Sequence, residues 1–291
     1  MKNIRLIILL AGILMPLVME AQSYAFLVLQ SKGQTAVKSG EEWTPIKVGS
    51  QLKVSDEIKI SDNGYLGLSH ASGRAFQVKE PGNFKVADLA SKVGKGSSAL
   101  NKYTDFILSS EQEKKNKLAA TGAVHRDVKK EIMLGLPSDP AKAEVQGNHF
   151  FLTWTADGSN SYKVVVMDLG EDELASFTVD TNNYMIDLSK GYEGTSQVLV
   201  KVISANGNTS DKYTVKKLTG HKKKKMDEAV GELGLSGEAT GLDKYILASF
   251  FEDRLMLIDA LTAYKEAAQA EPDVYQEAYE QFLSRFGFKP N

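Results

Sequence analysis

The sequence predicts a mainly β protein with α-helical parts, assembled from several small modules. Short runs with apolar residues at every second position occur from Tyr24 to Ala90 and return after Pro140. Beyond Gly241 the apolar spacing becomes that of helices. The chain has 291 residues, whereas single domains hold roughly 100 to 200. We therefore expect two to four compact units.

Residues 1–21 predict a signal peptide. Lys2 and Arg5 form a positive start, residues 6–18 are apolar, and Ala21 is the small residue that a signal peptidase prefers. The mature chain is then expected to begin at Gln22. An apolar stretch this short falls below the roughly 20 residues that cross a bilayer, so no membrane span is expected in the mature chain. We expect export to the periplasm, with the cell surface or secretion as alternatives.

Composition excludes several classes of protein. Without Lys2, Arg5 and Glu20 of the leader, 35 Lys and Arg become 33, and 37 Asp and Glu become 36. This slightly acidic balance argues against a nucleic-acid binder, which needs a basic surface. The chain has no cysteine, so it holds no disulfide, no thiolate metal site and no Cys nucleophile.

Residues 22–90 predict a small all-β sandwich or twisted barrel. The turn signals Ser61-Asp62-Asn63-Gly64 and Ser72-Gly73 separate short strands, because Asn-Gly and Ser-Gly tolerate positive φ. Regular strands with such turns are typical of this class. The expected strands lie at 25–29, 35–37, 58–60, 65–68, 75–78 and 84–86.

The same module carries a set of spaced glycine and apolar positions: Gly33-x-x-x-Val37, Trp43-x-x-Ile46-x-x-Gly49-x-x-Leu52, Asp56-x-Ile58-x-Ile60, Gly64-x-Leu66-x-Leu68 and Gly73-Arg74. Together they resemble the FecR-type periplasmic domain. Two positions depart from that pattern, since Ser55 replaces a usual Gly and Ala71-Ser72 replaces an acidic residue. Regulatory members of the family carry a cytoplasmic anti-sigma segment and a transmembrane helix before this domain. Neither is expected here, so signalling to a sigma factor is not the predicted role.

Trp43 has two interpretations within this module. A single tryptophan in a small β domain favours packing in the core. The alternative is a groove-lining residue that stacks against a ligand, which makes Trp43 a candidate contact.

Residues 91–140 predict a linker of helix and loop. Tyr103, Phe106 and Ile107 share one helix face at spacings of three and four. His125 and Arg126, in a compact loop, are candidate contacts for an anion, with a plain surface loop as the alternative. Pro137 and Pro140 mark the boundary, because proline keeps the residue before it out of helix.

Residues 141–220 predict a β-sandwich of Greek-key size. The motifs that carry this prediction are Leu152-x-Trp154, Tyr162-x-Val164-x-Val166 and Val198-x-Val200-x-Val202. They resemble a fibronectin type III domain, although Val198 stands where a corner tyrosine is expected. The resemblance implies that Trp154 is the core tryptophan.

Residues 221–240 predict a basic, glycine-rich hinge. His221 to Lys225 form a cationic run that suits a linker or a solvated first helical turn, with an anionic polymer or lipid head group as the alternative ligand. Gly231, Gly234 and Gly237 have low helix propensity and suggest a flexible joint.

Residues 241–291 predict a helical hairpin followed by a capping helix. Apolar, small and proline positions fall on a regular grid: Leu247, Ala248, Phe251, Ala260, Tyr264, Ala267 and Pro272. This grid resembles one tetratricopeptide repeat of about 34 residues. Tyr275, Ala278, Tyr279 and Phe282 then mark the third helix.

A lone repeat of this kind cannot bury both of its faces, so the helices should pack on another module or on another chain. The candidate partner contacts are Phe251, Tyr264, Tyr275 and Tyr279. In the second case the partner is expected to be another envelope protein.

The sequence gives little support to catalysis. The four histidines, His70, His125, His149 and His221, form no metal-binding pair, and no nucleophile elbow, phosphate loop or dinucleotide fingerprint occurs. We expect no catalytic residue, cofactor or metal site.

Three hypotheses for the function follow. The first is an exported, non-enzymatic cell-envelope protein that acts as a multi-module platform for protein binding or assembly. The second is a periplasmic or surface protein that binds glycan or peptidoglycan through Trp43 or Trp154. The third is a periplasmic sensor module that works with a separate membrane protein, as the FecR resemblance implies.

Overall fold

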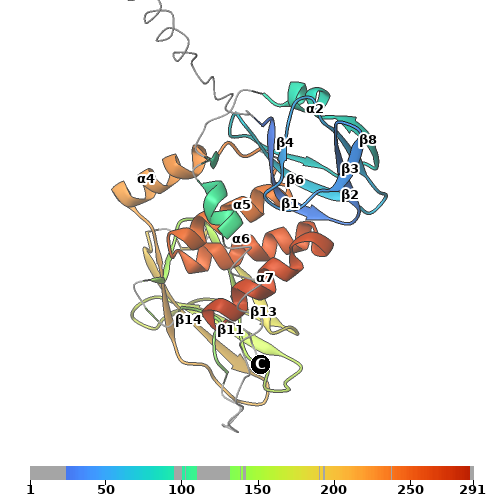
Figure 1. Cartoon of the computed structure of the whole chain (residues 1–291). Helices are drawn as coiled ribbons and strands as arrows, with labels where there is room; N and C mark the ends of the chain where they lie inside the picture. The colour runs from blue at the N-terminus through green and yellow to red at the C-terminus, as the bar shows by residue number, and fades with distance from the viewer. Residues whose placement is uncertain are drawn as a thin grey trace, which may run out of the picture.

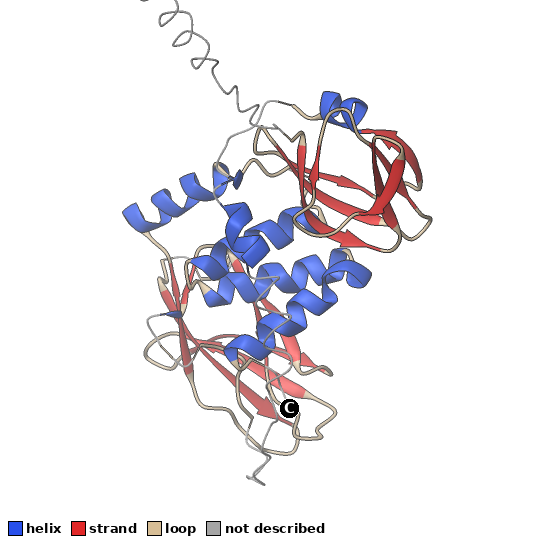
Figure 2. Cartoon of the chain, in the orientation of Figure 1, coloured by secondary structure: helices blue, strands red, loops and turns tan. Residues whose placement is uncertain are grey.

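The computed structural model of the chain describes residues 24–94, 100–109 and 132–288, leaving out residues 102, 138, 140–141, 190, 193 and 237. The described part is mixed, mainly β with α, as predicted. Two β modules lie at opposite ends, and a group of helices lies between them (Figure 1). Figure 2 shows the same arrangement, with the helices gathered in the middle of the molecule.

The first module is an open sandwich of two four-stranded sheets, with strand orders β4-β1-β6-β7 and β3-β2-β5-β8, and not a closed barrel. Alternation builds each layer: in β5, Ile58 and Ile60 face the core while Lys59 is exposed. The strands are β1 (Phe26–Lys32), β2 (Thr35–Ser39), β3 (Glu42–Pro45), β4 (Gln51–Leu52), β5 (Glu57–Ile60), β6 (Tyr65–His70), β7 (Ala75–Val78) and β8 (Gly82–Lys85), followed by helix α2 (Val86–Lys92).

Gly33 forms the turn between β1 and β2. Its φ is +72°, and a Cβ there would lie 2.4 Å from the carbonyl oxygen of Asn63. Both the left-handed backbone and the close approach require glycine at this position.

The second module has a five-stranded sheet in the order β12-β11-β14-β15-β9 and a two-stranded sheet, β10-β13. Trp154 is fully buried between them, which confirms it as a core residue. Its ring lies edge-on to that of Tyr162, with the ring centroids 5.5 Å apart. The strands are β9 (Glu144–Val145), β10 (His149–Thr153), β11 (Tyr162–Met167), β12 (Glu173–Val179), β13 (Asn183–Asp187), β14 (Gln197–Ser204) and β15 (Tyr213–Lys217).

The C-terminal segment forms the predicted helical hairpin and third helix: α5 (Gly241–Asp253), α6 (Leu257–Ala270) and α7 (Pro272–Phe286). Thr240 and Asp243 make a capping box at the start of α5, which satisfies two backbone N–H groups. Pro272 begins α7 and Gly287 ends it in a left-handed conformation. Local sequence therefore sets the ends of these helices.

The core of the three helices is shared with both β modules. Leu29 and Tyr65 reach it from the first module, and Phe151 and Leu218 reach it from the second. Residues 100–101 and 103–109 are also helical, and Leu100 and Ile107 from this stretch join the same core. Both faces of the helical group are thus covered by other parts of the same chain.

Tyrosines join the helices to the first module. The hydroxyls of Tyr65 and Tyr275 lie 2.8 Å apart, and the Tyr275 ring stacks on Tyr245 at 5.1 Å between centroids. Burial raises the pKa of Tyr275 well above its usual value, so the pair stays neutral. An ion pair between Lys79 and Glu271 lies at the rim of the same contact.

The contact with the second module adds hydrogen bonds to its apolar packing. Helix α6 packs on β10, and the Thr262 hydroxyl accepts a hydrogen bond from the Phe151 N–H at 2.9 Å. The same hydroxyl donates to the Ile258 carbonyl at 2.8 Å, so both of its functions are used.

Residues 220–231 form a helix, α4 (Gly220–Gly231), so the cationic run His221–Lys225 lies in solvated helical turns, the second of its two structural interpretations. None of its residues is buried. The Lys, Met, Glu and Ala residues of this segment have good helix propensity, and pairs such as Lys223 with Asp227 at 2.9 Å support a helix on the surface. Gly220 and Gly231 are its first and last residues, so both of these glycines lie at its ends.

Across the described ranges, no helix has both the length and the apolar character required to cross a membrane.

We predict that the described modules unfold together and that Tyr275→Ala separates them. The change removes a fully buried ring from the contact with the first module, so the free energy of unfolding should fall by about 3 to 5 kcal/mol. Differential scanning calorimetry should show one transition for the unmodified protein and an earlier or split transition for the variant. Leu169→Ala, at an exposed position, is the control. A variant trace that matches the control would contradict the prediction.

Candidate functional site

No three His, Cys, Asp or Glu side chains gather in a way that would hold a metal ion in the ranges that the structure describes. The candidate sites are a surface groove and a buried polar network.

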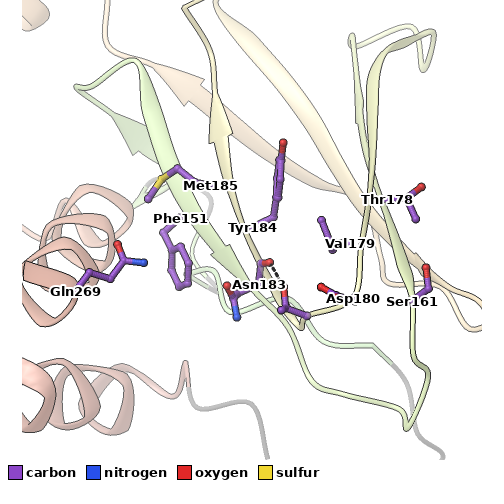
Figure 3. A pocket seen from close by; sticks show the side chains of 10 residues that line it. Phe151, Ser161, Thr178, Val179, Asp180, Asn183, Tyr184, Met185 and Gln269 are labelled. Carbon is purple, nitrogen blue, oxygen red and sulfur yellow. Dashed lines mark hydrogen bonds between the residues drawn. The ribbon is translucent and has the colours of Figure 1, made fainter.

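A groove of about 820 Å³ lies where the end of β12 and the start of β13 approach α6, and we name it the β13 groove. Figure 3 shows Gln269 on the helical side, opposite Phe151 and Met185, with Thr178, Val179 and Ser161 on the far side. The groove is lined by Phe151, Ser161, Thr178, Val179, Asp180, Thr181, Asn183, Tyr184, Met185 and Gln269.

The lining of the β13 groove mixes aromatic and hydrogen-bonding groups. Tyr184 stacks on Phe177 with ring centroids 4.8 Å apart, which holds the tyrosine ring in place. Thr181 donates its hydroxyl hydrogen to the Asn183 carbonyl at 2.9 Å and orders the turn beside it. Asp180 adds a negative charge to the groove. This lining suits a ligand with both apolar and polar groups.

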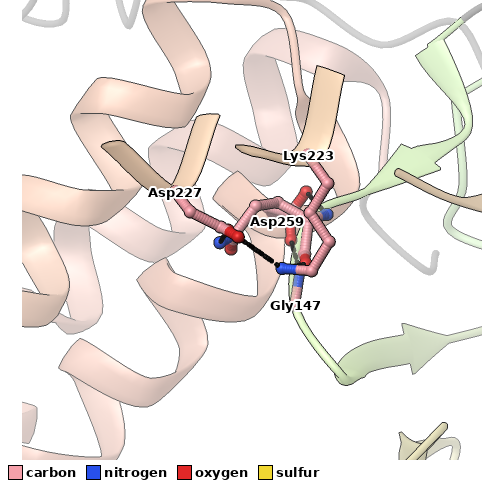
Figure 4. A network of polar contacts seen from close by, with 5 residues as sticks. Gly147, Lys223, Asp227 and Asp259 are labelled. Atoms are coloured by element: carbon pink, nitrogen blue, oxygen red, sulfur yellow. Dashed lines mark hydrogen bonds and ion pairs between the residues drawn. The ribbon is translucent and has the colours of Figure 1, made fainter. Parts of the chain in front are cut away.

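A polar network joins α4, the loop between β9 and β10, and α6 (Figure 4). The buried Asp259 carboxylate accepts hydrogen bonds from the backbone N–H groups of Gln146, at 2.9 Å, and Gly147, at 3.3 Å. The Gln146 side chain donates to Asp227 at 2.6 Å, and Asp227 pairs with Lys223. The network anchors the otherwise solvated helix α4.

The environment of Asp259 alters its titration. Burial raises the pKa of the Asp259 carboxyl to about 6, against the lowering effects of its two backbone hydrogen bonds and of His149 and Lys223. His149 is 2.7 Å from Glu266, and this hydrogen bond raises the pKa of His149. The Asp259 carboxyl therefore changes charge in mildly acidic solution.

Trp43 lies on the surface. Its side chain is 41% exposed, and all four residues of β3 are exposed. The interpretation of Trp43 as a core residue is therefore wrong. The physical reason is that β3 is the last strand of its sheet and pairs only with β2. Trp43 stays a candidate contact residue.

The four candidate contacts of the helices lie inside the protein. Tyr264 and Tyr275 are fully buried, and Phe251 and Tyr279 are exposed by less than a tenth. This corrects the expectation that they contact a partner, because their surfaces are used by the chain's own modules. His125 and Arg126 lie outside the described residues.

Sequence reasoning missed Asp259 and the β13 groove. Asp259 had a signal, since it is a single carboxylate within the apolar run Leu257-Ile258-Asp259-Ala260-Leu261 of a helix. The groove had none, because it depends on which strands pair and which edge is left open.

The comparisons with known proteins identify no family. No family model and no curated protein matches the chain. Solved structures that it partly resembles include the Arg-specific cysteine proteinase gingipain R, with TM-score 0.23 and 17% identity over 31% of this chain and 19% of that one. A complex of Porphyromonas gingivalis RgpB pro- and mature domains gives TM-score 0.23 and 16% identity over the same shares. The Clostridium perfringens spore cortex lytic enzyme SleM gives TM-score 0.18 and 21% identity over 25% of each chain.

The chain spans about a fifth of the length of the gingipain structures and a quarter of SleM. At these TM-scores the likeness supports no assignment of fold or activity.

We predict that Asp259 makes the protein less stable as pH rises from 4 to 6. The carboxyl has a folded pKa of about 6 against 3.8 when unfolded, so its protonated form stabilises the fold below pH 3.8 and this contribution is lost as pH rises through 6. The loss is up to about 3 kcal/mol.

Asp259→Asn cannot ionise, so the pH dependence of its unfolding free energy should be flatter. Urea unfolding at pH 4, 5, 6 and 7 measures the change, with Asp62→Asn at an exposed turn as the control. The comparison uses the slope of the unfolding free energy against pH and not its absolute value, because the new amide also weakens one hydrogen bond with the loop. Equal slopes for Asp259→Asn and the control would sink the assignment.

Proposed function

We propose that the protein is an exported, non-enzymatic component of the cell envelope that serves as a rigid platform for binding another envelope protein. One observation carries the proposal: the helical core takes side chains from both β modules. The exposed faces of the two modules are thereby held at fixed positions relative to each other, which suits a platform that presents more than one contact surface.

Because the candidate contacts of the helices are buried, we place the proposed partner contact on the β modules and not on the helices. Trp43 supports this placement, since it is a large aromatic exposed on a strand with no neighbour on its outer side. Tryptophan is among the residues that contribute most to protein interfaces. The partner surface is proposed to centre on β3.

The compartment and the family resemblances are part of the same proposal. The leader-like residues 1–21 and the absence of cysteine favour export to the periplasm. The FecR-like and fibronectin-like motifs are compatible with the two sandwiches, which also occur in binding modules of many kinds. The glycan alternative cannot use Trp154, because that side chain is buried.

We predict that Trp43→Ala weakens the partner complex at least tenfold, the effect expected for an interface tryptophan worth 2 kcal/mol or more. The complex is measured by crosslinking in the native cell envelope, followed by capture of the full-length chain. Met133→Ala, also at an exposed position but on the other module, is the matched control. Deleting the helices is unsuitable as a test, because it would expose the core of both modules.

The unfolding temperature of Trp43→Ala should stay close to that of the unmodified protein, since the side chain is already exposed. Equal recovery of crosslinked partner with Trp43→Ala and with the control would contradict the β3 surface. Failure to capture any partner with the unmodified chain would contradict the platform itself.

A further inference from the structure

We propose that the free edge of β13 binds an extended peptide segment, which adds to the β10-β13 sheet as a third strand and lies in the β13 groove. This goes beyond the proposed function, because the site lies on the second module, away from Trp43. The inference depends on where the backbone groups of β13 point.

Two hydrogen bonds fix that direction. The Trp154 N–H donates to the Asn182 carbonyl at 3.0 Å, and the Leu188 N–H donates to the Asn148 carbonyl. In an antiparallel pair, residues alternate between bonding across the pair and facing away from it. Tyr184, opposite Leu152, therefore bonds to β10, whereas the backbone groups of Asn183 and Met185 face the outer edge.

The hydrogen bonds on the outer edge of β10 agree with this alternation. On β10, the residues opposite Asn183 and Met185 are Thr153 and Phe151. The Phe151 N–H donates outward to Thr262 on α6, and the Thr153 carbonyl accepts from the Gly135 N–H at 2.7 Å. The outer edge of β10 is thus occupied by the protein itself.

The outer edge of β13 is open at Met185. The Asn183 carbonyl accepts the Thr181 hydroxyl. Within the ranges that the structure describes, no group hydrogen-bonds to the outward N–H or carbonyl of Met185, and β13 pairs with no strand besides β10. A donor and an acceptor beside each other on an open edge are the groups that an added strand uses.

The β13 groove lies along this edge. Successive strand side chains point to opposite faces, so a groove that contacts Asn183, Tyr184 and Met185 must run beside the strand. Thr178 and Val179 of β12 form the far wall, and Gln269 of α6 lies at one side. The groove therefore places space for a ligand next to the unpaired backbone groups.

The other strand ends of the described sheets carry features that discourage pairing. β4 and β9 have two residues each, β3 ends in Pro45, β7 contacts α5, β8 ends in Lys85 and β12 pairs with β11 through a bulge. β13 has five residues and contains no Lys or Pro, the residues that commonly protect an edge.

The lining specifies the peptide. Alternate side chains of an added strand would face Tyr184 and Val179 on one side, and Met185 and Gln269 on the other. An apolar or aromatic residue suits the first side, because the Tyr184 ring there is held in place by stacking on Phe177 and offers a fixed apolar surface. A basic residue suits the end of the groove near Asp180.

The test uses a phage-displayed library of random seven-residue peptides, selected on the full-length chain, and the free synthetic peptide that is retained best. Met185→Pro removes the outward N–H while leaving the bonds between β10 and β13, since proline is tolerated where the N–H of an edge strand faces outward. The dissociation constant of the selected peptide should be at least tenfold higher for Met185→Pro than for the unmodified chain. Met185→Ala keeps the N–H but loses the same side-chain contact, so the dissociation constant should rise less for Met185→Ala than for Met185→Pro.

Amide hydrogen exchange supplies a second measurement that needs no variant. In the free protein the amides of Tyr184 and Ile186 should exchange slowly and that of Met185 quickly. Peptide binding should slow exchange at Met185 at least tenfold. Trp43→Ala should leave peptide binding unchanged, which separates this site from the proposed partner surface.

Three results would overturn the inference. The first is that the library yields no specific peptide. The second is that the selected peptide binds folded Met185→Pro as tightly as the unmodified chain, or leaves exchange at Met185 unaltered. The third is that a neutral oligosaccharide, N-acetylglucosamine tetramer, binds the groove in preference to the selected peptide and ignores Met185→Pro, which would make the groove a glycan site.

Discussion

The structure depends on the need of helices α5, α6 and α7 to bury apolar surface on more than one side. A single helical hairpin with a cap exposes faces that water disfavours, and a stack normally covers them with further repeats. Here the cover comes from β modules that lie before the helices in the chain, with Tyr65 on one side and Phe151 on the other. Helices α5, α6 and α7 therefore complete a core that joins the two described β modules, and the exposed faces of both modules are held in their relative positions by that core.

The two contacts of the helices differ in chemistry. The Tyr65–Tyr275 contact is aromatic, and its hydroxyls stay neutral because burial raises the pKa of both. The opposite contact uses Asp259, whose carboxyl titrates with a pKa of about 6, and the Thr262 hydroxyl. A change in pH through this range therefore acts on the contact with the second module, whereas the Tyr65–Tyr275 pair stays neutral. The cationic helix α4 is linked to this second contact, because Lys223 and Asp227 hydrogen-bond to Gln146 in the loop that Asp259 holds.

Features set by local sequence could be predicted, and features set by pairing could not. The three C-terminal helices and the burial of Trp154 follow from apolar spacing and size, and both were correct. Trp43 was misplaced because an edge strand and an inner strand can share one alternating pattern. The full length of the helix at residues 220–231 was not predicted, because the glycines from Gly231 onward favoured a joint and drew attention from the helix formers that precede them. The open edge at Met185 needs the register of β10 and β13, which no local pattern contains.

The fixed placement of β10 bears directly on how an added strand would bind at β13. An edge that had to become ordered on binding would lose affinity to the entropy of ordering. Here Thr262 of α6 and the backbone of Gly135 already hold the outer side of β10, and β10 in turn holds β13 through its alternate residues. Phe177 likewise fixes the ring of Tyr184. The helices that join the modules thus also preorganise the groove, so an incoming peptide would spend little of its binding energy on arranging the site.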